Sequence, residues 1–250
     1  MQIDCDFARI IAWKNLTALV NALLSDDLGR KKMKVFEYGN PAADRILIQM
    51  VDDHDLEFIE REVDAIAREA DATECEKDET ARGDFRLIAI QVADWNKDLS
   101  PWKAPAVFGK EDFGDGAGNT LAEVLSYCQD ETKTYYIGGY SLAALFALWA
   151  AYQTDKFSGV AAASPSIWFP GFVDYMKEHE IQSGSVYLSL GDKEEKTRNT
   201  VMATVGEKIR EAQSWLESQG VRCTLEWNQG NHFKDADIRT AKAFAWVMDQ

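Results

Sequence analysis

The sequence predicts an α/β domain with a mostly parallel central sheet and helices on both faces. Short apolar runs rich in Ile, Val and Tyr alternate with segments of helical periodicity, which is typical of parallel strands joined by helices. The chain has 250 residues, of which 46% are hydrophobic and 28% charged, so it is long enough to bury a large core. No internal repeat, low-complexity tract or linker interrupts it, and we therefore expect one domain over residues 1–250.

Seven apolar runs are candidate strands. In chain order they cover residues 34–38, 45–51, 85–92, 134–140, 159–164, 186–190 and 223–227. We expect the first to form an edge strand, followed by a turn at Gly39-Asn40-Pro41. The first thirty residues fit no single type of element.

Helical patterns occupy four further segments. These are residues 56–66, 142–152, 200–219 and 238–248. The first has apolar residues at helical spacing and charged residues on the other face, with Asp55 as its expected cap. The second is apolar nearly all round, as expected for a helix buried against the sheet. The third is amphipathic, and Gly220 is well placed to end it.

Acidic residues outnumber basic ones. The 42 Asp and Glu residues and 27 Lys and Arg residues give a formal net charge of -15, which repels a phosphate backbone. Nucleic acid is therefore not an expected partner. No apolar run approaches the roughly 18 residues of a membrane-spanning helix, and acids stand where a signal peptide carries basic residues. We expect a cytoplasmic protein with no membrane partner, whereas the oligomeric state is not predicted.

The four cysteines, Cys5, Cys75, Cys128 and Cys223, are scattered along the chain. They form no C-x-x-C motif and no spacing suited to zinc or an iron–sulfur cluster. In a reducing compartment we expect them to be free thiols. A redox role that depends on cysteine has no supporting motif.

The most informative segment is a strand, a sharp turn and a helix that meet at Ser141. Residues 134–140 run into Gly138-Gly139-Tyr140-Ser141-Leu142-Ala143 and then directly into the apolar helix. A nucleophile on such a turn needs small residues two positions before and after it, because the two backbones come close together. Gly139 and Ala143 fill these places. Ser141 is thus a candidate nucleophile, and the alternative is a glycine-containing strand end with an incidental serine.

A serine hydroxyl needs a base to remove its proton, and histidine is the usual base near neutral pH. The chain has three histidines. His179 lies among charged residues on an expected surface helix, where a solvated role is favoured. His54 follows the strand at 45–51 and is a candidate substrate contact. His232 lies between the last strand and the last helix, in the loop that supplies the base in α/β-hydrolases, and is the candidate base.

The third catalytic group must be a carboxylate that orients the imidazole and stabilises its protonated form. After the strand at 186–190 the chain reads Gly191-Asp192-Lys193-Glu194-Glu195, so three acids compete. The acid in this fold usually follows the strand-ending glycine by about three residues, which selects Glu194 over Asp192 and Glu195. The order of serine, acid and histidine along the chain is that of the α/β-hydrolases.

Acyl transfer also needs hydrogen-bond donors for the developing oxyanion. We expect one from the backbone N–H of Leu142, directly after the candidate nucleophile, and the other from the backbone N–H of Asp53. The acidic run Asp52-Asp53-His54-Asp55 invites a metal-site interpretation. Its four side chains cannot all converge on one ion, however, so we favour a helix-capping turn and predict no metal site.

Several ordered segments resemble the esterase D-like group of α/β-hydrolases, which includes ferric enterochelin esterases and S-formylglutathione hydrolases. The resemblance covers roughly residues 34–250. Beyond the serine turn it rests on residues 94–101 (DWNKDLSP), 114–118 (GDGAG) and 163–168 (ASPSIW). These are similar to the group's loop after the second core strand, its glycine-rich helix start, and its Ser-Pro-Ser motif followed by an aromatic residue. The sequence departs from the group at Trp95, at Ala143 and in the acidic Asp52-Asp53 loop.

This resemblance implies an α/β-hydrolase fold and hydrolysis of carboxylic esters through an acyl-serine, with no metal or organic cofactor. Only about twenty residues separate Ser164 from Val186, which leaves no room there for a large cap domain. We therefore expect an open site for a small-molecule ester that has a short or exposed acyl group. Tyr140 and Trp168 are further candidate substrate contacts.

Two other functions remain open at this level. A thioesterase or a peptidase uses the same three residues on a different acyl group. A catalytically inactive hydrolase fold can also serve as a binding module, since fold does not determine function.

Overall fold

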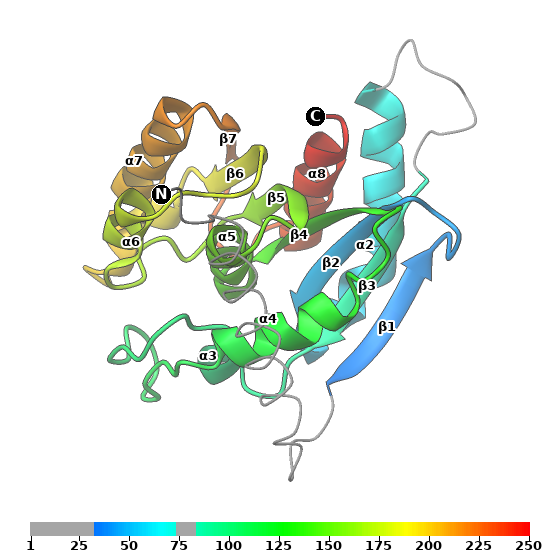
Figure 1. The fold of residues 1–250 in the computed structure, drawn as a ribbon. Helices are drawn as coiled ribbons and strands as arrows, with labels where there is room; N and C mark the ends of the chain where they lie inside the picture. Colours follow the sequence, from blue (N-terminus) through cyan, green and yellow to red (C-terminus); the bar gives the residue numbers. More distant parts are fainter. Residues whose placement is uncertain (1–32, 74–83) are drawn as a thin grey trace, which may run out of the picture. The chain divides into compact units, whose positions relative to one another are not determined.

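A seven-stranded sheet forms the centre of the fold (Figure 1). In the computed structural model, which describes residues 33–73 and 84–250, the strands are β1 (Lys34–Gly39), β2 (Arg45–Val51), β3 (Arg86–Gln91), β4 (Thr134–Tyr140), β5 (Phe157–Ala163), β6 (Ser185–Gly191) and β7 (Arg222–Asn228). Their order across the sheet is β1-β3-β2-β4-β5-β6-β7. β1 is antiparallel to β3 at one edge, and all other neighbours are parallel. The predicted mostly parallel sheet with an edge strand near residue 34 is confirmed.

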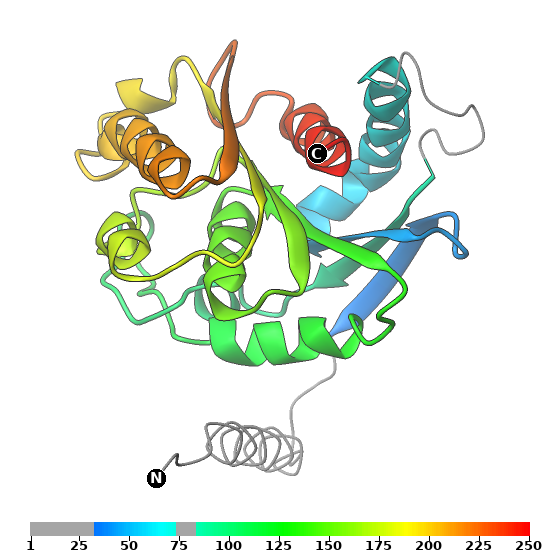
Figure 2. The same ribbon diagram turned by 45° about the horizontal axis from the view of Figure 1, so that its top comes forward.

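Helices cover both faces of the sheet (Figures 1 and 2). They are α2 (Asp53–Thr73), α3 (Trp95–Asp98), α4 (Ala117–Ser126), α5 (Leu142–Gln153), α6 (Phe172–Glu178), α7 (Val205–Ser218) and α8 (Ala236–Met248), with short 3-10 turns η1 (Glu194–Lys196) and η2 (Met202–Thr204). One core contains side chains of α4, α5, α6 and α7, and the other those of α2 and α8. Only α6 lies between β5 and β6, so this connection carries no large cap.

The alternation of side chains along the strands supplies both cores. In β2, Ile46, Ile48 and Met50 face the α5 side, whereas Leu47 and Val51 face the α2 side, as the period of two in a strand requires. Each central strand is buried on both faces, which explains why these strands are continuous apolar runs in the sequence.

The start of α2 differs from the expectation that Asp55 caps the helix. The Asp52 carboxylate accepts a hydrogen bond from the Asp55 N–H at 2.8 Å, and the Asp55 carboxylate accepts one from the Asp52 N–H at 3.1 Å. This reciprocal pair is a capping box in which Asp52 is the cap and Asp55 lies three residues inside. The helix-capping interpretation of the acidic run was therefore right, but the cap was assigned three residues too late.

The segment predicted as one helix over residues 200–219 is divided. η2 comes first and α7 begins at Val205. Before η2, the side-chain oxygen of Asn199 accepts the N–H groups of Val201 and Met202, so a local turn takes the place of a first helical turn. Gly220 follows Gln219, the C-cap residue of α7, and has φ +77°, as predicted for the glycine that ends this helix.

Several sequence expectations concern residues outside the described part of the chain. They are Cys5, Cys75 and the first thirty residues, so the single domain over residues 1–250 stays a prediction. Cys128 and Cys223 have free thiols, and burial raises the pKa of each to about 12. Among the described helices, none is both long and apolar enough to cross a membrane.

Candidate active site

Ser141 lies on a strained turn between β4 and α5. Its φ of 58° and ψ of -118° lie outside the regions that L-residues usually adopt. A Cβ atom added at Gly139 would lie 2.8 Å from the Cβ of Ala143, and one added at Gly138 would lie 2.6 Å from the Cβ of Ala161. Small residues are therefore needed at these positions, as predicted for Gly139 and Ala143, and the turn presents the Ser141 hydroxyl at the carboxyl end of β4.

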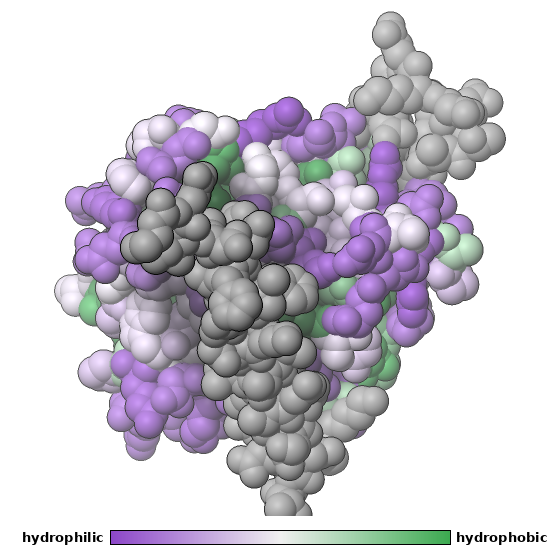
Figure 3. Space-filling view, viewed as in Figure 1, coloured by the Kyte–Doolittle hydropathy of each residue, from purple (hydrophilic) through white to green (hydrophobic). Residues whose placement is uncertain are grey.

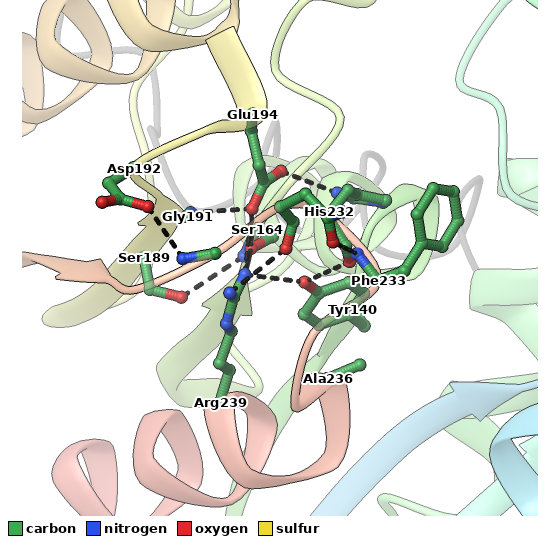
Figure 4. A network of polar contacts seen from close by, with 12 residues as sticks. Tyr140, Ser164, Ser189, Gly191, Asp192, Glu194, His232, Phe233, Ala236 and Arg239 are labelled. Carbon is green, nitrogen blue, oxygen red and sulfur yellow. Dashed lines mark hydrogen bonds and ion pairs between the residues drawn. The ribbon is translucent and has the colours of Figure 1, made fainter. Parts of the chain in front are cut away.

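His232 lies between the serine and a carboxylate. Its Nε2 atom is 3.0 Å from Oγ of Ser141, and its Nδ1 atom is 2.7 Å from Oε2 of Glu194. Figure 4 shows the Glu194 side chain turned toward the His232 ring. The side chain of His232 is 25% exposed and that of Glu194 is 5% exposed, so the chain of contacts runs from the surface into the protein. The structure thus brings together Ser141, His232 and Glu194.

The other carboxylate oxygen of Glu194 is fully occupied by donors. Oε1 accepts the N–H of Gly191 at 2.7 Å, the hydroxyl of Ser164 at 2.9 Å and Nη1 of Arg239 at 3.0 Å. Burial alone would raise the pKa of Glu194, but the hydrogen bond and charge of His232 and the bonds from Gly191 and Ser164 lower it below 4.5. The carboxylate is consequently ionised near neutral pH.

The two competing acids lie elsewhere. Asp192 is exposed, and its carboxylate accepts the N–H of Gly230 at 2.8 Å. That bond lowers the pKa of Asp192 below its usual value. The carboxylate of Glu195 lies 3.4 Å from the guanidinium of Arg210. The Asp192 carboxylate thus supports the backbone of the loop that leads to His232, and the Glu195 carboxylate pairs with a side chain of α7.

Two serines of the Ser-Pro-Ser segment take part in the site. Ser164 donates to Glu194 and has φ 42°, while the hydroxyl of Ser166 is 3.3 Å from that of Ser141. The N–H of Ser166 also donates to the Ser141 carbonyl at 3.0 Å. The sequence singled out this segment only by its resemblance to the esterase D-like group. The contacts show what its two serines do in the structure.

The two expected oxyanion donors each lie at the start of a helix. Leu142 is the first residue of α5 and Asp53 the first residue of α2, where a backbone N–H has no acceptor within its own helix. α5 follows β4 and α2 begins just after β2, and these strands are neighbours. The two N–H groups therefore lie at the same edge of the sheet as Ser141. The Asp53 carboxylate accepts from the Gln91 side chain at 2.6 Å.

The expected substrate contacts differ in their surroundings. His54 is exposed at the start of α2, where its ring contacts Phe58 and lies 3.8 Å from Glu57; these contacts do not include Ser141 or His232. Trp168 is buried against Phe108 and Phe113. Tyr140 donates its hydroxyl to the His232 carbonyl at 2.8 Å. Burial and the Glu194 charge raise the pKa of Tyr140 to about 12, which keeps this hydroxyl protonated.

Sequence reasoning missed Arg239, which contacts both Glu194 and Tyr140. The signal was present in the periodicity of α8. Arg239, Ala243 and Val247 recur every four residues and are all buried, so the arginine lies on the apolar stripe of the helix. His179, by contrast, lies at the exposed end of α6 and stacks on Tyr175, away from the site as expected.

By sequence, the chain matches no family model and no curated protein. Solved structures do match it over most of its length. The siderophore hydrolase EstA from Aspergillus nidulans matches with a TM-score of 0.60 and 16% identity, over 88% of this chain and 95% of its own. An IroE-like serine hydrolase from Shewanella oneidensis matches with a TM-score of 0.64 and 13% identity, over 86% of this chain and 75% of its own.

A third match is the carboxylesterase of Bacillus cereus, with a TM-score of 0.53 and 12% identity over 92% of this chain and 98% of its own. At these identities the likeness establishes the fold. As predicted, the described part of the chain has the α/β-hydrolase fold, which it shares with esterases. Within these residues, the connection between β5 and β6 carries no large cap.

Proposed function

We propose that the protein is a serine hydrolase that cleaves carboxylic esters through an acyl-serine intermediate. The observation that carries the proposal is the hydrogen-bond chain from the Ser141 hydroxyl through His232 to Glu194, with distances of 3.0 and 2.7 Å. A base within this reach can take the serine proton as the oxygen attacks. The esterases and serine hydrolases among the structural neighbours support the same activity.

The proposed reaction has two halves. Oγ of Ser141 attacks the acyl carbon while its proton moves to Nε2 of His232, and the imidazolium is stabilised by the Glu194 carboxylate. The tetrahedral intermediate collapses when His232 gives this proton to the leaving alcohol, which leaves an acyl-serine. Water then attacks the acyl carbon and gives its proton to His232, and the carboxylic acid departs as the proton returns to Ser141.

The backbone N–H groups of Leu142 and Asp53 are the proposed donors to the oxyanion. Donors aimed at the developing charge are worth about 10²–10³ in kcat each in hydrolases of this kind. Both residues begin helices, so the helix dipoles add positive potential at the oxyanion. No metal or organic cofactor is required by this scheme.

The proposed substrates are small-molecule esters with short or exposed acyl groups. The connection between β5 and β6 holds only the seven-residue α6, so it forms no cap over Ser141. Phe233 is 88% exposed, and its ring centroid lies 5.6 Å from that of His232. It offers an apolar surface beside the proposed base, with His54, Tyr140 and Trp168 as the other proposed contacts.

Parallel assays of the wild type, Ser141→Ala and Ser158→Ala on p-nitrophenyl acetate, butyrate and octanoate test the activity. Ser158 is an exposed serine of β5 and serves as the matched control. We expect rates that fall with chain length, loss of about 10⁴-fold or more in Ser141→Ala, and no loss in Ser158→Ala. Equal rates in all three proteins, with no fluorophosphonate label on Ser141, would contradict the proposal and favour a binding module.

Thioester and anilide substrates with the same acyl group separate the related activities. An esterase is expected to prefer the oxygen ester over the anilide. The leaving alcohol of the ester needs less protonation by His232 than the leaving amine of the anilide does. A preference for the thioester would instead assign a thioesterase, and efficient anilide cleavage would assign a peptidase.

A further inference from the structure

Arg239 is a buried charge that the proposed reaction does not use directly. Its side chain is 2% exposed and reaches from the first turns of α8 toward the carboxyl end of β6 (Figure 4). A buried guanidinium has a high desolvation cost, and an apolar side chain of similar volume often leaves a protein equally stable. Stability alone therefore does not explain this buried charge, and the hydrogen-bond partners of Arg239 indicate what else it does.

The guanidinium fixes the orientation of the Glu194 carboxylate. Nη1 of Arg239 lies 3.0 Å from Oε1, while the other oxygen, Oε2, receives His232 at 2.7 Å. Each carboxylate oxygen thus has a different partner, and rotation of the carboxylate would break both contacts. The guanidinium is a cation, so it places a positive charge beside the buried carboxylate.

The same guanidinium also holds the loop that carries His232. Nη2 of Arg239 donates to the carbonyl of Asn231 at 3.2 Å and to that of Gln229 at 3.5 Å. Nη1 lies 3.1 Å from the hydroxyl of Tyr140, which in turn donates to the carbonyl of His232 at 2.8 Å. One side chain therefore connects the acid to the backbone on which the histidine is carried.

We propose that Arg239 is a positioning residue, which sets the alignment of Glu194 with His232 from the side opposite the substrate. This inference rests on the proposed function. The charge of the Arg239 guanidinium and its fork-shaped geometry have separate effects. The charge limits how strongly Glu194 holds a proton on His232, and the fork fixes the position of the His232 loop relative to Ser141.

The Arg239→Met variant removes both effects. We expect kcat to fall by about 10- to 100-fold with little change in KM, because a small displacement of the base is costly while the substrate surface is intact. We also expect the acidic limb of the kcat/KM profile to move to higher pH. Without the arginine charge, Glu194 holds the proton on His232 more strongly, so the base is blocked at a higher pH.

Two further variants separate charge from geometry. Arg239→Lys keeps the charge near Glu194 but cannot reach the loop carbonyls as a fork. The acidic limb of its kcat/KM profile should lie at the wild-type pH, while its kcat should still be lower than that of the wild type. Tyr140→Phe removes the hydroxyl that contacts both the His232 carbonyl and Nη1 of Arg239, but it keeps the arginine charge and the other arginine contacts. It should lower kcat less than Arg239→Met does, without moving the acidic limb.

The experiment compares pH profiles of kcat and KM for p-nitrophenyl acetate, together with thermal unfolding, in the wild type and these three variants. Lys242→Met is the matched control, since Lys242 lies three residues further along α8 and pairs with Glu226 at 2.7 Å. It should keep wild-type kinetics. If Arg239→Met does not fold, a lower kcat at a wild-type acidic limb in Arg239→Lys supports the inference when this variant also unfolds at the wild-type temperature, because general loss of structure is then excluded. A lower unfolding temperature together with the lower kcat would overturn it.

Wild-type kcat and an unmoved acidic limb in Arg239→Met would overturn the role of Arg239, and so would wild-type kcat in Arg239→Lys. A lower kcat with an unmoved limb in Arg239→Met would also overturn it, because general loss of structure explains that result. Absence of Ser141-dependent turnover in the wild type is a different outcome. It would overturn the proposed function itself, and the two failures are therefore distinguishable.

Discussion

Asp192 and Glu194 are two residues apart, yet their carboxylates have different surroundings. Glu194 is buried and contacts His232, whereas Asp192 is exposed and accepts the N–H of Gly230. We expect Glu194→Gln to lower kcat by about 10²–10⁴-fold, because the neutral amide cannot stabilise a protonated imidazole. Asp192→Asn should turn over at close to the wild-type rate, since an amide oxygen can still accept the Gly230 N–H.

The measurement is kcat and KM of both variants on p-nitrophenyl acetate, with unfolding curves to show that each is folded. Asp192→Asn is the matched control because it removes one negative charge from the same loop. A larger loss in Asp192→Asn than in Glu194→Gln would contradict the proposed role of Glu194. The sequence could rank these acids only by their spacing from Gly191. The contacts of Ser164 and Arg239 with Glu194 join residues 30 and 45 positions apart, and no local pattern encodes them.

At the scale of elements, local chemistry predicted which segments form helices and strands, but not always how they begin. Helix starts depend on which of several nearby polar side chains accepts the free backbone N–H groups. Examples are the capping box of Asp52 and Asp55 and the side-chain turn at Asn199. Periodicity does not distinguish between these choices, whereas it does place the apolar stripe of the helix that follows.

The helix α2 carries a buried carboxylate, Glu62, against strand β2. Oε2 of Glu62 accepts from the Gln49 side chain at 3.4 Å. Within the described residues, Oε1 of Glu62 and Oε1 of Gln49 have no hydrogen-bond partner. Burial, followed by the charge of Asp55, raises the pKa of Glu62 well above 4.5. Burial and the Asp52 charge likewise raise the pKa of Asp55 to about 6.

These raised pKa values predict that stability falls as pH rises. The folded state binds a proton at Glu62 more tightly than the unfolded chain does, so the cost of ionisation is absent below the unfolded-state pKa and grows toward the folded-state pKa. In Glu62→Gln this cost disappears, and the new amide N–H can donate to Oε1 of Gln49. We expect the free energy of unfolding to rise by about 1–3 kcal/mol near pH 8.

Urea unfolding of the wild type and Glu62→Gln at about pH 4 and pH 8 checks this prediction. The two proteins should differ little at the lower pH and most at the higher one. Glu60→Gln, on the exposed side of the same helix, is the control and should behave as the wild type at both. A stabilisation of Glu62→Gln that is equal at the two pH values would show that packing, rather than ionisation, is responsible.

At the scale of the whole molecule, the sheet could be predicted because its central strands are buried on both faces and read as apolar runs. The meeting of Ser141, Glu194 and His232 follows from topology, because the carboxyl ends of the parallel strands β4, β6 and β7 lie at one edge of the sheet. The role of α8 is different. It packs against α2 and the sheet, and its Arg239 reaches the site through tertiary packing that the sequence order does not reveal.

The whole molecule has a formal net charge of -15 at pH 7. The described residues that can be seen in Figure 3 form a mostly hydrophilic surface. The exposed Asp53 and Asp192 follow the carboxyl ends of β2 and β6, at the edge where Ser141 lies. The negative potential should therefore act on a charged substrate during its approach to the site.

We expect cationic esters to be cleaved faster than anionic ones for this reason. Acetate esters of one alcohol that bears either a trimethylammonium or a sulfonate group form a matched pair. At low ionic strength kcat/KM should favour the cation by roughly tenfold, and salt should reduce this ratio toward one as screening shortens the reach of the field. A neutral acetate ester is the control and should respond little to salt. Preference for the anionic ester at low salt would mean that a local cation near Ser141, rather than the net charge, governs the approach of the substrate.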